Sequence, residues 1–230
     1  MKKTLSPFRT LRAGFSLVEA MVTTGILGLV TVGTLGFFVQ SMNIFSYDSG
    51  KIMVNRDIRK FTSEMTDNAT YANYFLIFPA FDNRTVSQNV TDPVTGAVTS
   101  VTSDTSVNDG LSGDFLVLVY KDDADPNKTS RLVGYYRAVS SSDVNAEGPV
   151  RKFDVSFSPS SSGAVWTLLP ATSTMNTNTQ VIELSRGMAS GKLFYNLYDR
   201  SVMVKGQIIH RGSETKRATN TYNFTVSPRG

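Results

Sequence analysis

The residues from Phe15 to Phe45 form an apolar run that contains one ionisable side chain, Glu19. As a helix, these about 31 residues would extend over roughly 46 Å, more than the ~30 Å hydrocarbon core of a bilayer. A charged group inside a segment of this kind is costly and is usually functional. The run therefore predicts a membrane-spanning helix in which Glu19 has a role of its own.

A short basic segment precedes the apolar run. It carries Lys2, Lys3, Arg9 and Arg12 and no acid among residues 1–14, so it accounts for the whole net charge of +4. Basic residues in front of a membrane span keep that end in the cytoplasm, and the part after the span is then exported. Because the remaining residues carry no net charge, the overall charge does not indicate a protein that binds polyanions in general.

Three interpretations of the N-terminal segment compete. A secretory signal has an apolar core of about 7–15 residues before its cleavage site, and this run is about twice as long. A plain signal anchor accounts for the length and the flanking charges but leaves Glu19 without a role. The third interpretation rests on the residues immediately around Glu19.

The stretch "RAGFSLVEAMV" resembles the cleavage and methylation motif of type IV prepilins and type II secretion pseudopilins. In that family a basic leader is followed by Gly, an aromatic residue or Met, Ser or Thr, two apolar residues and Glu. The resemblance implies cleavage by prepilin peptidase between Gly14 and Phe15, N-methylation of Phe15, and a register role for Glu19 during assembly. One departure is Ala13, which follows Arg12 where family members often have Lys or Arg directly before the Gly.

Simple electrostatics accounts for the carboxylate in this motif. Cleavage would leave a cationic amine on Phe15, four residues before Glu19, and unlike charges attract far more strongly in a low-dielectric medium than in water. In the family, the Glu would pair with the amine of a neighbouring subunit, so that pairing selects the axial register of the helices. The alternative is a carboxylate that snorkels to the membrane interface at the helix start.

After Asp48 the apolar residues recur at spacings of three and four, which predicts that one helix extends from Phe15 to about Thr70. Its amphipathic half has the apolar positions Val54, Ile58, Phe61, Met65 and Ala69.

Beyond the helix, short apolar or alternating runs are separated by turn residues, which predicts antiparallel strands and polar connections. Residues 83–113 and 140–149 are expected to be polar loops or ribbons, and the last two strands are expected to form a hairpin across Arg211–Arg217. The predicted strands are Tyr74–Phe78, Phe115–Tyr120, Leu132–Val139, Val150–Phe157, Gln180–Leu184, Leu193–Tyr198, Val202–Ile209 and Thr219–Val226.

These elements predict the α+β class, and the family resemblance implies a type IV pilin-like fold with the long helix packed on an antiparallel sheet. The pieces "YANYFLIF", "GKLFYNLYD", "SVMVKGQIIH" and "YNFTVSPRG" resemble minor pilins and pseudopilins of the J or W kind, which favours a minor subunit. The expected divisions are a cytoplasmic leader (1–14), a transmembrane or filament-core helix (15–47), the amphipathic half of that helix (48–72) and a β-rich head (73–230).

Few residues are suited to catalysis. The chain has one histidine, His210, and no cysteine. The side chains needed for Ser-His-Asp catalysis, Cys-His catalysis or a zinc site are therefore almost entirely lacking. His210 follows a predicted strand and is interpreted as a surface residue. We therefore do not expect an enzyme.

A weak calcium candidate lies in "DDADPNK", where Asp123, Asp125 and Asn127 alternate as oxygen ligands do in calcium loops. An EF-hand needs Gly at its sixth position and Glu at its twelfth, and these are Lys128 and Gly134 here. A solvated turn is the favoured interpretation, and no other cofactor is expected.

The last part of the chain is basic, since residues 181–230 carry +5 whereas residues 15–180 carry −5. Aromatic residues mixed with cations can contact DNA, but alternating aromatics in strands are more often core residues or cross-strand pairs. Nucleic acid is therefore not an expected partner. The residues concerned are Tyr195, Tyr198, Tyr222, Arg186, Lys192, Arg200 and Lys216.

Together, these features predict a structural minor pilin or pseudopilin that is built into, or primes, a type IV pilus or a type II secretion pseudopilus. The alternative is an adhesin or a DNA-uptake subunit displayed by the same helix. The expected partners are other subunits, prepilin peptidase, an inner-membrane assembly platform and, before assembly, membrane lipid. The expected location is the bacterial inner membrane, with a cytoplasmic N-terminus and an exported head, and afterwards a periplasmic or extracellular filament.

Overall fold

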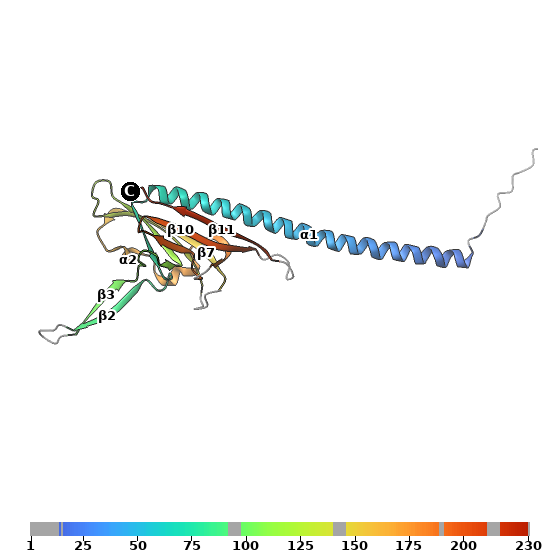
Figure 1. Ribbon diagram of the computed structural model, residues 1–230, viewed down its shortest axis with the longest axis horizontal. Helices are drawn as coiled ribbons and strands as arrows, with labels where there is room; N and C mark the ends of the chain where they lie inside the picture. The colour runs from blue at the N-terminus through green and yellow to red at the C-terminus, as the bar shows by residue number, and fades with distance from the viewer. Residues whose placement is uncertain are drawn as a thin grey trace, which may run out of the picture. The chain divides into compact units, whose positions relative to one another are not determined.

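A computed structural model describes residue 14 and residues 16–91, 98–139, 146–188, 191–210 and 217–229. The chain divides into two compact units, one that ends at Ser46 and one that begins at Tyr47. One long N-terminal apolar helix and a large antiparallel sheet make up the fold, which confirms the α+β class (Figure 1).

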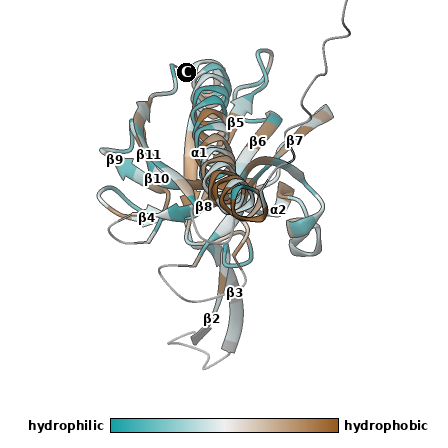
Figure 2. Cartoon of the chain, turned by 90° about the vertical axis from the view of Figure 1, so that its right-hand side faces the viewer, coloured by the Kyte–Doolittle hydropathy of each residue, from teal (hydrophilic) through white to brown (hydrophobic). Residues whose placement is uncertain are grey.

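The helix α1 (Leu17–Tyr71) contributes residues to both units. Its observed ends lie close to the predicted ones, Phe15 and about Thr70. In the first unit nearly all of its described side chains are exposed. Most of these residues are apolar, as the brown colour of this stretch in Figure 2 shows. This part is long and apolar enough to cross a membrane.

In the second unit, one face of α1 lies against the sheet. The predicted apolar positions form this face: Val54, Phe61, Met65 and Ala69 are buried, and Ile58 is partly buried. Phe61 is central to the contact, because its ring meets the rings of three residues edge-on at centroid distances of 5.8–5.9 Å. These three residues are Tyr135, Tyr222 and Phe224.

The described strands pair only in antiparallel fashion, and the main sheet has the order β1-β5-β6-β7-β8-β10-β9-β4, with β11 along the other side of β10. All eight predicted strands are present, with ends shifted by a few residues. Their bounds are β1 (Tyr74–Phe78), β4 (Ser112–Gly113), β5 (Phe115–Lys121), β6 (Thr129–Arg137), β7 (Gly148–Ser161), β8 (Thr179–Gly187), β9 (Phe194–Leu197), β10 (Ser201–His210) and β11 (Ala218–Val226).

The region 83–113, predicted as polar loops or ribbons, contains a two-stranded ribbon of β2 (Thr85–Thr91) and β3 (Val98–Asp104). The ribbon forms a sheet of its own and points away from the main sheet (Figure 1). In the second expected loop, residues 140–145 lie outside the described residues. The strand β7 already begins at Gly148, so the last part of that prediction was wrong.

The half of the sheet formed by β1, β5, β6 and β7 is covered on both faces. Leu116 and Leu118 pack in the core that includes α1, whereas Phe115 and Val117 pack in a second core on the opposite face. The segment containing α2 (Val165–Leu168) and the 3-10 helix η1 (Thr172–Asn176) contributes to this second core. Two covered faces explain why "FLVLV" is apolar at every position.

The other half of the sheet has one covered face. Side chains of β10 alternate between buried and partly exposed along most of the strand, as the alternating sequence predicts. Tyr222 on β11 is buried, and its hydroxyl shares a hydrogen bond with that of Ser185 (3.0 Å). Its ring lies over Gly206, where a Cβ would come within 2.5 Å of the Tyr222 oxygen, so this position requires glycine.

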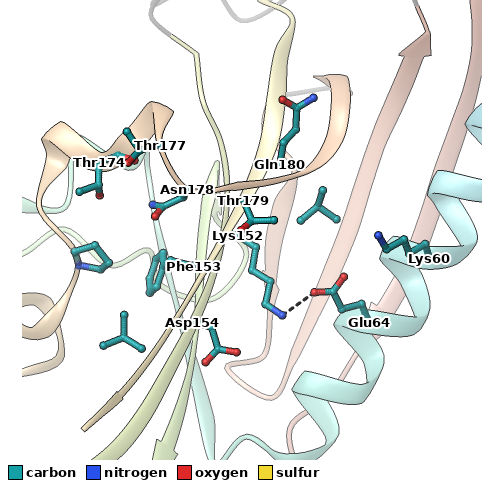
Figure 3. A pocket seen from close by; sticks show the side chains of 13 residues that line it. Lys60, Glu64, Lys152, Phe153, Asp154, Thr174, Thr177, Asn178, Thr179 and Gln180 are labelled. Atoms are coloured by element: carbon teal, nitrogen blue, oxygen red, sulfur yellow. Dashed lines mark hydrogen bonds and ion pairs between the residues drawn. The ribbon is translucent and has the colours of Figure 1, made fainter.

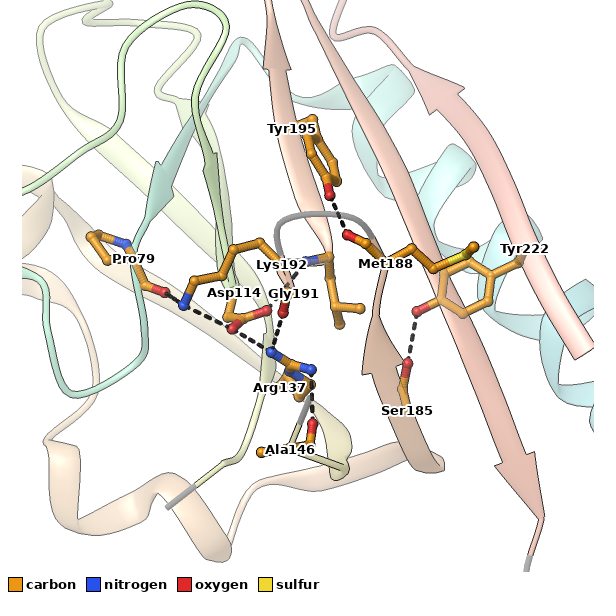
Figure 4. A network of polar contacts seen from close by, with 11 residues as sticks. Pro79, Asp114, Arg137, Ala146, Ser185, Met188, Gly191, Lys192, Tyr195 and Tyr222 are labelled. Carbon is orange, nitrogen blue, oxygen red and sulfur yellow. Dashed lines mark hydrogen bonds and ion pairs between the residues drawn. The ribbon is translucent and has the colours of Figure 1, made fainter. Parts of the chain in front are cut away.

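A buried ionic network joins distant parts of the head. The Asp114 carboxylate accepts a hydrogen bond from the Arg137 guanidinium (2.7 Å), one from the Lys192 ammonium (3.1 Å) and one from the backbone N–H of Leu193 (3.2 Å) (Figure 4). Arg137 also donates to the carbonyl oxygen of Ala146 at 3.0 Å. Asp114 and Arg137 are each 4 % exposed, so this pair carries its charges inside the protein.

We expect Asp114→Ala to lower the free energy of unfolding by about 3–5 kcal/mol, because it leaves a buried guanidinium without its carboxylate. Asp154→Ala is the matched control. It breaks an ion pair with Arg131 that is more than a third exposed and should cost at most about 1 kcal/mol. Urea unfolding followed by the fluorescence of Trp166 measures both, and similar losses for the two variants would contradict the role of Asp114.

A second prediction concerns alkaline pH. Burial raises the pKa of Tyr222 to about 12 from an ordinary value of 10.0, despite the hydrogen bond from Ser185. The contribution of Tyr222 to the free energy of unfolding is therefore fully present below about pH 10, where the phenol is neutral in the folded and the unfolded state. This contribution is lost as the pH rises toward about 12. By about pH 11 the wild type should lose about 1 kcal/mol more than Tyr222→Phe, and equal losses in urea unfolding would contradict this.

Candidate assembly site at the start of the apolar helix

The first turn of α1 positions Glu19. Ser16 precedes the helix, and its hydroxyl oxygen accepts a hydrogen bond from the backbone N–H of Glu19 at 3.2 Å. Ser followed by Glu three residues later is the capping-box pattern, in which the Glu side chain also bonds back to the backbone of the capping residue. That return bond is not present among the described residues. Ser16 therefore caps the helix, while the Glu19 carboxylate is left free for another partner.

The threonine hydroxyls of the apolar helix bond within the helix itself. Each donates to the backbone carbonyl oxygen four residues earlier, with distances of 2.6–2.8 Å. These bonds were not predicted, although threonine inside an apolar helix is known to bond in this way. They satisfy polar groups that would otherwise be costly in hydrocarbon. The threonines are Thr23, Thr24, Thr31 and Thr34.

Glu19 differs from these threonines. Its side chain is exposed, and among the described residues its carboxylate has no hydrogen bond and no ion pair. The position is favourable for a negative charge, since the N-terminus of a helix carries a partial positive charge. That interaction is weak compared with a full ion pair in a low-dielectric medium. Among the described residues, Glu19 thus has no side-chain partner on its own helix.

Small residues give the same stretch of helix a surface for close packing. Leu17 and Met21 border a shallow hollow of about 480 Å³ over Ala20, Thr24 and Gly25. Small residues let helices approach each other closely in membranes. A Cβ added at any of four glycines would have no atom within 4 Å, so a neighbouring helix has room there; these are Gly25, Gly28, Gly33 and Gly36.

The structure describes the processing motif only in part. Gly14 is exposed, as a peptidase substrate requires, and Ser16 and Glu19 are placed as above. The predicted new N-terminus, Phe15, lies outside the described residues. The same holds for the leader charges Lys2, Lys3, Arg9 and Arg12, so their predicted roles stay predictions.

The weak calcium candidate forms a turn that bonds to itself. Asp125 accepts the backbone N–H of Asn127 (3.1 Å) and pairs with the Lys128 ammonium (3.2 Å), and these contacts lower its pKa. The neighbouring Asp122 accepts the backbone N–H of Ala124 (2.8 Å) and a hydrogen bond from Ser160. In the part of the chain that the structure describes, no three His, Asp or Glu side chains gather as metal ligands. The geometry favours the solvated turn.

The residues considered for DNA contact do not form one surface. Tyr222 is buried, Lys192 belongs to the Asp114 network, and Arg186 donates to the side-chain oxygen of Gln207 at 2.7 Å. Tyr198 is 79 % exposed. Lys216 lies outside the described residues. The mixture of cations and aromatics that the sequence suggests is thus divided between the interior and the surface.

His210, interpreted from the sequence as a strand-end surface residue, is only partly exposed. Its Nε2 lies 3.6 Å from a carboxylate oxygen of Glu183, and its Nδ1 is buried without a partner among the described residues. Asp57 on α1 is close enough to interact with it, and burial raises the pKa of that carboxyl. His210 and Glu183 lie on the strands β10 and β8, so their contact joins two strands of the sheet.

A polar groove of about 640 Å³ lies between α1 and the strands β7 and β8 (Figure 3). Its charged side chains are largely paired: Glu64 with Lys152 at 2.7 Å, and Asp154 with Arg131 at 2.6 Å. The hydrogen bonds from Arg131 lower the pKa of Asp154. The groove presents hydroxyl and amide groups, which suit contact with another polar surface.

Comparisons with known proteins leave the family open. No protein-family model matches the chain, and neither the curated proteins nor the solved structures contain a significant match. What the chain does must therefore follow from its residues and their geometry.

Proposed function

We propose that the chain is a structural minor subunit of a type IV pilus or of a type II secretion pseudopilus. The observation that carries this proposal is the Glu19 carboxylate, which has no partner among the described residues and lies in the first turn of a helix whose threonine hydroxyls bond within the helix. A simple membrane anchor gains nothing from such a group. A helix that must find a neighbouring subunit in one register gains a selective contact.

Before assembly, the chain resides in the bacterial inner membrane with its N-terminus in the cytoplasm and its head exported. Prepilin peptidase cleaves between Gly14 and Phe15, and the new amine on Phe15 is methylated. The basic leader, the membrane-length apolar helix and the exposed Gly14 support this order of events. The head then packs in a periplasmic or extracellular filament, in the manner of the type IV pilin-like fold.

The register contact follows from electrostatics. At 4 Å, two unit charges attract by about 4 kcal/mol at an effective dielectric constant of about 20, compared with about 1 kcal/mol in water. A helix that slides out of register separates the Glu19 carboxylate from the neighbour's Phe15 amine and leaves both charges unpaired. The hollow over Ala20, Thr24 and Gly25 lets the two helices approach closely enough for this contact.

The alternative, a displayed adhesin or DNA-uptake subunit, has less support. DNA contact needs accessible cations beside accessible aromatics. Tyr222 is buried instead, and the partly exposed Lys192 and Arg186 already bond to Asp114 and Gln207.

To test the register role, Glu19→Gln is expressed in cells that assemble the wild-type filament. The variant should enter the membrane normally, but its share in sheared filaments should fall at least about tenfold, as a loss of about 1.4 kcal/mol would give. Immunoblots of membrane and filament fractions measure both quantities.

The matched control is Thr31→Ala, further along the same helix and outside the hollow over Ala20, Thr24 and Gly25. Its hydroxyl bonds to the carbonyl oxygen of Leu27 (2.7 Å), so incorporation should stay near the wild-type level. Normal incorporation of Glu19→Gln, or an equal defect in both variants, would refute a register role for the carboxylate.

A further inference from the structure

The ribbon of β2 and β3 is exposed wherever the structure describes its side chains. These are Thr85, Val86 and Ser87 on β2 and residues 99, 100 and 102–104 on β3. Among the described residues, its strands pair with each other and with no other strand. An isolated two-stranded hairpin is marginally stable at best in water. Both outer edges of the ribbon are therefore open, and a third strand that hydrogen-bonds to one of them would stabilise it.

The strand β11 offers an open edge of matching length. It pairs with β10 along its whole length, from Ala218 to Val226, and no described strand lies on its other side. Alternate residues of an antiparallel strand turn their N–H and C=O groups away from the partner strand. The outer edge of β11 thus presents a row of backbone groups, of which only the Thr221 N–H has a described side-chain acceptor, Asn220 (2.9 Å).

This edge lacks the usual protection. Exposed edge strands are commonly guarded by Lys, Pro, a bulge or a covering loop. The sequence "ATNTYNFTV" of β11 contains no charge and no proline, and its pairing with β10 is continuous. The strand β1, in contrast, has its other side partly covered. The backbone N–H of Val107 donates to the carbonyl of Ile77 (2.7 Å), and Gly113 packs directly against the carbonyl of Phe78.

The ribbon and the β11 edge lie on different sides of the head in both views (Figures 1 and 2). Their surroundings also differ in charge. Residues 82–109 contain four Asp and one Arg, whereas the exposed Arg229 follows β11 and Arg217, which precedes it, pairs with Glu147 at 3.1 Å. A pairing between two copies would therefore bring the acidic ribbon near Arg229, which favours association.

We propose that the ribbon of one copy adds to the β11 edge of a second copy and extends its sheet. The ribbon strands each have seven residues and β11 has nine, so one ribbon strand can pair along most of the edge. The exposed side chains of β11 are Thr and Asn, and those of the ribbon are mainly Ser and Thr. Hydrogen bonds between Thr and Thr or Ser side chains stabilise neighbouring strands.

The contact is heterologous, because it joins two different surfaces of the same chain. Each copy keeps a free ribbon and a free β11 edge at its two ends, so contacts of this kind continue into rings or open helical arrays. The pairing involves head residues only. It requires neither processing at Gly14 nor the Glu19 contact, so its failure would leave the proposed function untouched.

The absence of cysteine gives a clean test by disulfide cross-linking in the full-length, membrane-inserted chain. One tagged copy carries Ser100→Cys on the ribbon, and a second copy with a different tag carries Cys at one exposed position of β11. We expect mixed disulfide dimers on oxidation for at least one of the β11 positions. The positions to be tried in turn are Thr219, Thr221, Asn223 and Thr225.

Two controls make the result decisive. Ser156→Cys, exposed on β7 and away from either edge, sets the background of chance collisions. Thr221→Glu, combined with Asn223→Cys, should reduce the mixed dimer at least about tenfold by placing a negative charge against the acidic ribbon, with an unchanged melting curve of Trp166 fluorescence. The proposal would be overturned by mixed dimers at the Ser156 background, by pairs of ribbon with ribbon or of β11 with β11 in their place, or by no effect of the glutamate.

Discussion

Glu19, a single carboxylate in a membrane-length apolar helix, is the feature that most constrains the function of the chain. The helix can satisfy its own backbone and its threonine hydroxyls, because each of these has an acceptor one turn earlier. Glu19 has no such partner among the described residues. A charge of this kind favours any state in which an opposite charge comes near it. For this reason an assembly role explains the N-terminal segment better than anchoring alone.

The head is built so that one element, residues 47–71 of α1, can rest on a stable sheet. Phe61 and its three aromatic neighbours form the centre of that contact. On the opposite face, a second core under α2 and η1 covers four strands. The Asp114 network then links the ends of β4 and β5 to the neighbouring strands β6 and β9, through Arg137 and Leu193. Among the described strands, the ribbon of β2 and β3 and the outer side of β11 have edges without a pairing strand.

Much of this architecture follows from local sequence pattern. The spacing of Val54, Phe61 and Met65 predicts the buried face of α1, and continuous or alternating apolar runs predict all eight strands. What the pattern could not predict depends on contacts between distant residues. Asp114 meets Arg137 and Lys192 only because the sheet order brings them together. Likewise, the burial of Tyr222, which separates it from the exposed Tyr198, depends on the packing of α1. At the candidate site, the motif predicts Glu19, but not that Ser16 caps the helix while the carboxylate stays free.

The identity of the mature N-terminus tests the proposed role of the first helix most directly. In the proposed assembly, cleavage after Gly14 creates the amine that pairs with Glu19, so a chain that is not cleaved there could not form this contact. Mass spectrometry of the N-terminal peptide, from chain purified out of membranes, should find a peptide that begins at Phe15 and carries one methyl group on its amine. A chain that retains Met1, or one that begins near residue 45 after signal cleavage, would contradict the assembly role.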